Sequence, residues 1–71
     1  MRIFSEVLAE NLRVARARAG LSQERLAIRA NVDRAIISAI ENGRGNPTHK
    51  TLCALADALA ITPADLYLKG K

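Results

Sequence analysis

Two helical patterns meet within one or two residues in the stretch ANVDRAIIS, residues 30–38, and this break constrains the fold most. The first pattern runs up to Ala30, and the second begins just after Val32. A chain that turns this sharply needs one residue in the left-handed backbone region, which asparagine accepts more readily than any residue except glycine. We therefore expect Asn31 to adopt that conformation and Val32 to fill the corner between the helices.

The residues around this turn have the sizes that two closely crossing helices require. Ala27 precedes the turn, and a larger residue there would push the helices apart. Ile37 and Ile40 fall on one face of the following helix and close the far side of the corner. With Gly20 and Gly43 bracketing the unit, the pattern predicts a helix-turn-helix.

Helical periodicity accounts for the rest of the sequence, and no sustained strand pattern accompanies it. The spacing predicts helices over about residues 4–19, 23–30, 34–41, 49–60 and from 63 onward. Each helix after the first follows a residue typical of an N-cap, and these residues are Ser22, Asp33, Thr48 and Thr62. The sequence therefore predicts an all-α, compact five-helix fold, with residues 1–71 forming a single domain.

The charge of the chain favours a polyanionic partner. Eleven basic and seven acidic residues give 71 residues a formal net charge of +4, which is typical of a protein that binds nucleic acid. No apolar run approaches the roughly 20 residues that span a bilayer, so we expect no membrane association. The single cysteine, Cys53, fits a reducing compartment, and the expected location is the cytoplasm.

The sequence has no motif that is typical of an enzyme. One histidine and one cysteine do not make the ligand spacing of a zinc site, and no glycine-rich phosphate loop is present. Serine, histidine and aspartate all occur, but nothing marks a nucleophile turn. We expect no catalytic activity, no bound metal and no cofactor.

With these elements in place, the sequence resembles the phage-repressor and Cro-like (XRE) helix-turn-helix family of bacterial transcription regulators. The segments LSQERLA, IISAIENG and TLCALADALAITPADLY carry the similarity, which covers about residues 8–68. Within that family, DRAIISAIENGRGNPT is most similar to the small controller proteins of restriction–modification systems. Those proteins usually have RTYIS where this sequence has RAIIS, so Ala35 and Ile36 depart from their pattern.

The resemblance implies that the helix after the turn enters the DNA major groove with its N-terminal residues at the base edges. Arg34, Ala35 and Ser38 lie opposite the apolar face of this helix and are the expected base-contacting residues. Arginine can form two parallel hydrogen bonds with guanine, and alanine suits a thymine methyl group. For Ile36 two interpretations stay open, contact with the sugar-phosphate backbone or packing against the fourth helix.

The same resemblance implies residues that position the domain on DNA. The expected phosphate contacts are Gln23, Asn42, Arg44 and Asn46. His49 and Lys50 are weaker candidates for the same role. In the family, the residues that match Arg16 and Glu41 form a partly buried ion pair between the first and third helices. We expect this pair to fix the recognition helix against the rest of the domain.

One such module contacts only a few base pairs, so we expect a homodimer on a pseudo-palindromic double-stranded DNA operator. The dimer surface is expected in the last helices, at Leu66, Tyr67 and Leu68. RNA polymerase is a possible further partner. The alternatives are an antitoxin or prophage repressor of the same fold, or a protein-interaction module without specific DNA binding. The sequence does not distinguish activation from repression.

Overall fold

The computed structural model describes residues 4–68, and within that range all regular structure is helical. Five helices follow one another in the chain, and their bounds are α1 Phe4–Arg18, α2 Gln23–Ala30, α3 Arg34–Glu41, α4 His49–Ala58 and α5 Pro63–Tyr67. The predicted all-α, five-helix fold is therefore confirmed. The main difference is that α4 ends two residues before Ala60, where the periodicity alone extends the helix.

The helices start where side-chain caps are available. Ser22, Thr48 and Thr62 each accept a hydrogen bond from the backbone nitrogen three residues later, and Asp33 accepts one from Ala35. These bonds satisfy amide groups that have no partner within the helix. At α5, Thr62 and Asp65 bond reciprocally, which stabilises the start of a helix of only five residues.

The first four helices end in the same way. In each, a residue one or two positions after the last helical residue has a positive φ, and the next amide bonds back to a carbonyl five residues earlier, as in a Schellman motif. The residues with positive φ are Gly20, Asn31, Gly43 and Ala60. Short connections follow, so each helix changes direction within a few residues.

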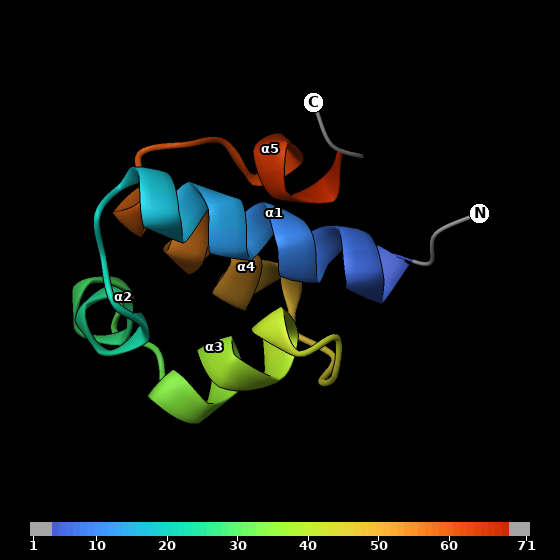
Figure 1. Cartoon of the computed structure of the whole chain (residues 1–71), viewed down its shortest axis with the longest axis horizontal. Coiled ribbons are helices and arrows are strands. Elements are labelled where there is room, and N and C mark those ends of the chain that lie inside the picture. The colour runs from blue at the N-terminus through green and yellow to red at the C-terminus, as the bar shows by residue number, and fades with distance from the viewer. Residues whose placement is uncertain (1–3, 69–71) are drawn as a thin grey trace.

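The arrangement leaves α3 on the outside of the domain. In Figure 1, α1 crosses the middle of the molecule, α5 lies on one side of it, and α2 and α3 lie on the other. α1 packs against both α3 and α5, while α4 packs against α2 and α5. Consequently one surface of α3 is supported by the domain and the opposite surface faces solvent.

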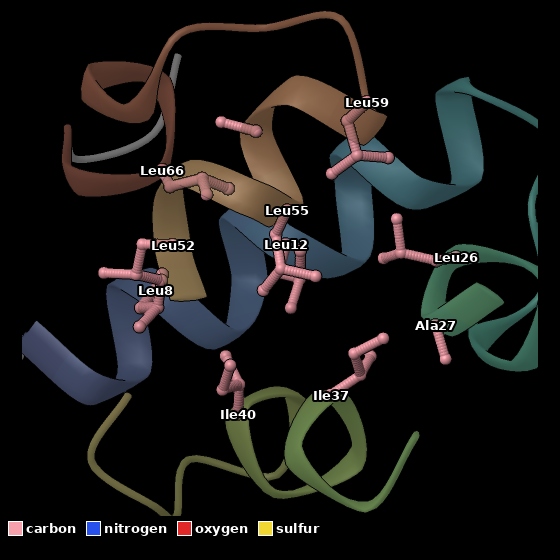
Figure 2. Close-up of a cluster of buried hydrophobic side chains, with 11 residues drawn as sticks. Leu8, Leu12, Leu26, Ala27, Ile37, Ile40, Leu52, Leu55, Leu59 and Leu66 are labelled. Carbon is pink, nitrogen blue, oxygen red and sulfur yellow. The ribbon is translucent and has the colours of Figure 1, made fainter. Parts of the chain in front are cut away.

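A single apolar cluster joins all five helices. Figure 2 shows Ile37 and Ile40 of α3 pointing toward Leu12 of α1 and Leu55 of α4, and none of the four is more than 2% exposed. Leu66 completes the cluster from α5. Burying a large aliphatic side chain contributes about 1.5–3 kcal/mol to the free energy of folding, so this cluster is the main interaction that stabilises the packing of the helices.

Within residues 4–68, none of the helices is both long enough and apolar enough to cross a membrane.

Candidate nucleic-acid interface

The α3 helix presents a polar, exposed face from a rigid base. Asp33 caps its start, because Oδ1 of Asp33 accepts a hydrogen bond of 2.9 Å from the amide of Ala35. Arg34 and Ala35 are exposed in the first turn, and Ser38 is half-buried one turn later. The three residues predicted to contact bases therefore lie on the side of α3 that the core does not use.

The turn before α3 has the predicted left-handed residue. Asn31 has φ 57° and ψ 46°, and its amide bonds to the carbonyls at the end of α2. The amide of Val32 bonds to the carbonyl of Ala27 at 3.0 Å, and the Val32 side chain packs against the apolar cluster. This turn sets the angle between α2 and α3.

Glu41, the last residue of α3, is the centre of a network that ties three helices together. Its carboxylate accepts hydrogen bonds from Arg16 Nε at 2.7 Å and Nη2 at 3.0 Å, and from Gln23 Nε2 at 3.0 Å. Arg13 donates a further hydrogen bond to the backbone carbonyl of Glu41. α3 is therefore anchored to α1 and α2 through Glu41, a buried residue that is 5% exposed.

The surroundings of Glu41 keep it charged. Burial alone would raise the pKa of Glu41, but the hydrogen bonds from Arg16 and Gln23 and the positive charges of Arg16 and Arg13 lower the pKa below its ordinary value. The hydrogen bond with Glu41 in turn raises the pKa of Arg16. The pair is therefore ionised at neutral pH.

Gln23 combines a structural contact with a position suited to DNA. It is the first residue of α2, and its side-chain amide nitrogen bonds to Glu41. That nitrogen has two N–H groups, so one remains after the bond to Glu41 is made. The start of α2 also has unpaired backbone amides and the positive end of the helix dipole, which favour an anion.

The loop after α3 holds the other residues predicted to contact phosphate. Asn42 Nδ2 donates to the carbonyl of Ser38 at 2.8 Å, so this side chain is fixed to α3. Arg44 and Asn46 are exposed, and the backbone between them turns at Gly45 with φ 85°. Asn42 and Arg44 thus continue the exposed side of α3 past its end.

The C-terminal residues require one correction. Leu66 was expected at a dimer surface, but it is fully buried in the core, so a partner subunit cannot reach it. Tyr67 is half-buried and Leu68 is 56% exposed, and these two remain accessible. In a helix of five residues the spacing alone could not separate the side that packs inward from the side that faces out.

His49, the first residue of α4, is exposed and contacts this C-terminal region. Its Nδ1 lies 2.9 Å from the hydroxyl of Tyr67, and its Nε2 lies 3.3 Å from Sγ of Cys53. The contacts join the start of α4 to α5, and they hold the Tyr67 ring in place. The weaker expectation of a phosphate contact by His49 stays a prediction.

The sequence did not predict the hydrogen bonds of two residues, Arg13 and Asn11. Arg13 bonds to the end of α3, and Asn11 donates to the carbonyls of Leu66 and Leu68 and so fixes α5 on α1. The available signal for Arg13 was its spacing from Arg16, since residues three apart share a helix face. Nothing local marked Asn11, whose partners lie 55 and 57 residues away.

Together these features define a helix-turn-helix DNA-binding domain. A supported helix with an exposed arginine in its first turn matches the dimensions and the hydrogen-bonding pattern of the major groove. Gln23 at a helix start and Arg44 in a loop lie on either side of it in the sequence, as phosphate contacts do in such domains.

Comparison with known proteins agrees with this class. The sequence matches the family described as helix-turn-helix domain over residues 7–67. It is 39% identical to a hypothetical transcription factor of Neisseria meningitidis over 62 residues, which are 87% of this chain and 58% of that protein. It is 34% identical to the HTH-type transcriptional regulator y4dJ of Sinorhizobium fredii, over 86% of this chain and 79% of the relative.

Solved structures show the same similarity. The Neisseria factor superposes with a TM-score of 0.90 and 36% identity, over 94% of this chain and 77% of the other. The restriction-modification controller protein C.AhdI of Aeromonas hydrophila superposes with a TM-score of 0.85 and 35% identity, over 89% of this chain and 96% of the controller. The chain therefore belongs to the helix-turn-helix domain family, whose members among these relatives are transcription regulators and not enzymes.

Proposed function

We propose that this protein is a sequence-specific, double-stranded DNA-binding transcription regulator that acts as a homodimer in the cytoplasm. The observation that carries the proposal is α3, whose first turn is exposed while its opposite face and its end are locked into the core and the Glu41 network. Such rigid support holds recognition side chains in one geometry, which sequence-specific readout requires. The family membership of the chain supports the same conclusion.

In this proposal the residues divide into two groups. Arg34, Ala35 and Ser38 contact base edges, where Arg34 donates two hydrogen bonds to O6 and N7 of a guanine. Gln23, Asn42, Arg44 and Asn46 contact phosphates and set the position of the domain on the duplex. With a net charge of +4, the domain attracts DNA at long range before these specific contacts form.

Dimerisation follows from the small footprint of one domain. Two copies related by a two-fold axis would place their α3 helices in successive major grooves, roughly 34 Å apart on one side of the duplex. The operator is then pseudo-palindromic. Tyr67 and Leu68 are the proposed contacts between the copies, because both are accessible. Tyr67 is the last residue of α5 and Leu68 is its C-cap, and α5 lies on the far side of α1 from α3 (Figure 1).

A role as a restriction–modification controller is the more specific form of the proposal. It is supported by the similarity to C.AhdI, which matches this chain over nearly the whole length of that controller. RNA polymerase is then a further proposed partner. The competing assignments within the same fold are an antitoxin and a prophage repressor.

Selection from a pool of random-sequence duplexes tests the function directly. The proposal predicts that repeated rounds of binding enrich an inverted repeat whose half-site centres are about 10 base pairs apart. Competition with unselected duplex should then show the 10³-fold or greater preference that is typical of specific binding. A pool that stays random after selection, with equal binding of all duplexes, would show that the protein is not a sequence-specific regulator.

A further inference from the structure

A hollow lies beside the exposed face of α3, at the point where the loop after this helix folds back. Its volume is about 210 Å³, and it is formed between α3 and the start of α4. Ile36, Ala39 and Ile40 line it from α3, and Gly45, Pro47 and Thr51 are among the residues that line it from the other side. The α3 wall of the hollow is thus entirely apolar.

Ile36 gives this hollow an exposed apolar side chain. Its side chain is 41% exposed in the second position after Arg34, on a helix whose neighbouring residues at the surface are polar or small. Covering the exposed part of an isoleucine would be favourable by about 25 cal/mol for each Å² removed from water. Residues 4–68 leave this part of Ile36 exposed, so an apolar group from a binding partner would be stabilised by covering it.

The backbone of the loop keeps the hollow open. Gly45 has φ 85°, and a Cβ placed on it would lie 3.3 Å from Cβ of Ala39. Both positions have small residues, so the loop approaches α3 closely without filling the space beside Ile36. A larger residue at position 39 or 45 would displace the loop.

The next step rests on the proposed function: if α3 enters the major groove, the hollow beside it lies next to the edges of the bases. Ile36 is two positions after the expected base reader Arg34, and the loop that holds the proposed phosphate contact Asn46 lines the other side of the hollow. In the major groove, the pyrimidine C5 position is the part of the base edge closest to the backbone of its own strand. We propose that the hollow receives the 5-methyl group of a thymine, and that Ile36 is the residue that reads it.

Replacing thymine by deoxyuridine tests this assignment, because the exchange removes the methyl group alone. Each thymine of a selected operator half-site is replaced in turn, and binding is measured for the wild-type protein, Ile36→Ala and Ile36→Val. We expect one position at which deoxyuridine weakens wild-type binding about fourfold per half-site, which is the change expected when one methyl group is no longer buried. Ile36→Val should keep most of this penalty, and Ile36→Ala should lose it.

Ile28→Ala is the matched control, since Ile28 is 73% exposed on α2 and does not line the hollow. It should retain the deoxyuridine penalty in full, and circular dichroism should show all variants to be folded. The assignment is overturned if no thymine shows a penalty, or if Ile36→Ala keeps it. It is equally overturned if Ile36→Ala weakens all duplexes alike, because Ile36 then packs on deoxyribose. Failure of the proposed function would be distinct, since no operator would be selected at all.

Discussion

Asn31 and Ala60 are the residues other than glycine that have positive φ within residues 4–68. Both lie just after the end of a helix, Asn31 between α2 and α3 and Ala60 between α4 and α5. Their chemistry differs, because asparagine tolerates the left-handed region and alanine is disfavoured there. The same backbone geometry should therefore respond differently to glycine at the two positions.

Asn31 should tolerate glycine and reject valine. Asn31→Gly keeps the backbone conformation available, whereas Asn31→Val places a β-branched residue at φ 57°. We expect Asn31→Val to reduce the free energy of unfolding by about 1–3 kcal/mol and to weaken DNA binding, since the turn orients α3. Thermal melts and binding curves of the two variants check this. If valine is as stable and binds as well as asparagine, the turn does not set the orientation of α3.

Ala60 should be improved by glycine. The left-handed conformation costs alanine about 1–2 kcal/mol, and the greater freedom of glycine in the unfolded chain offsets part of the gain. We therefore expect Ala60→Gly to raise the free energy of unfolding by about 0.5–1 kcal/mol. Chemical denaturation measures this change, and Ala64→Gly, an exposed position inside α5, should be destabilising in the same assay. Destabilisation by Ala60→Gly would contradict the backbone argument.

At the scale of helices, the central feature is that α1, α2 and α3 converge on Glu41. Arg16 and Gln23 donate to its carboxylate and Arg13 donates to its backbone carbonyl, so Glu41 couples the orientation of α3 to the other helices. The pKa of Glu41 is lowered in the folded state. Its contribution to stability is therefore fully present above the unfolded-state pKa of about 4.3 and is lost as the pH falls through the lower folded-state pKa.

Glu41→Gln should remove this contribution and its pH dependence. At pH 7 we expect the variant to be about 1–3 kcal/mol less stable, because Arg16 loses a charged partner. Below about pH 4.3 the difference between variant and wild type should shrink. Urea denaturation at a series of pH values checks both, with Glu24→Gln on the exposed side of α2 as the control. A constant difference across the whole pH range would contradict the assignment.

Local sequence signals predicted the start of each helix and most of the ends. Ser22, Asp33 and Thr48 are typical N-cap residues, and a glycine such as Gly43 is typical of a helix end where one residue has a left-handed backbone conformation. Each of these positions therefore has its own local signal. Ala60 carries no such signal, because its conformation follows from the turn that brings α5 onto the core. Contacts such as those of Arg13 and Asn11 depend on which helices become neighbours, and periodicity within one helix does not determine this.

At the scale of the whole molecule, each copy presents one exposed α3, and the proposed two-fold assembly would pair two such helices on DNA. A two-fold interface uses the same patch on both copies. Leu68 is the most exposed apolar residue of that proposed patch, at 56%, while Leu66 beside it belongs to the core. A substitution of Leu68 should therefore affect assembly, whereas a substitution of Leu66 should affect folding.

Leu68→Lys should produce folded monomers, because two lysines would face each other across the two-fold axis. We expect sedimentation to show dissociation, with binding to an inverted repeat weakened roughly 10²-fold through the loss of the second half-site. Ile28→Lys, at an exposed apolar position on α2, should remain dimeric. A dimeric Leu68→Lys protein would place the interface elsewhere on the surface.

Whether the first turn of α3 reads bases is decided by the affinity of Arg34→Ala for a selected operator and for random duplex. We expect a loss of about 1–3 kcal/mol on the operator, a much smaller loss on random duplex, and relaxed preference at one base pair. Arg29→Ala, which removes an exposed arginine from the last turn of α2, should leave the ratio of the two affinities unchanged. Equal losses on operator and random duplex would mean that Arg34 contacts only the DNA backbone.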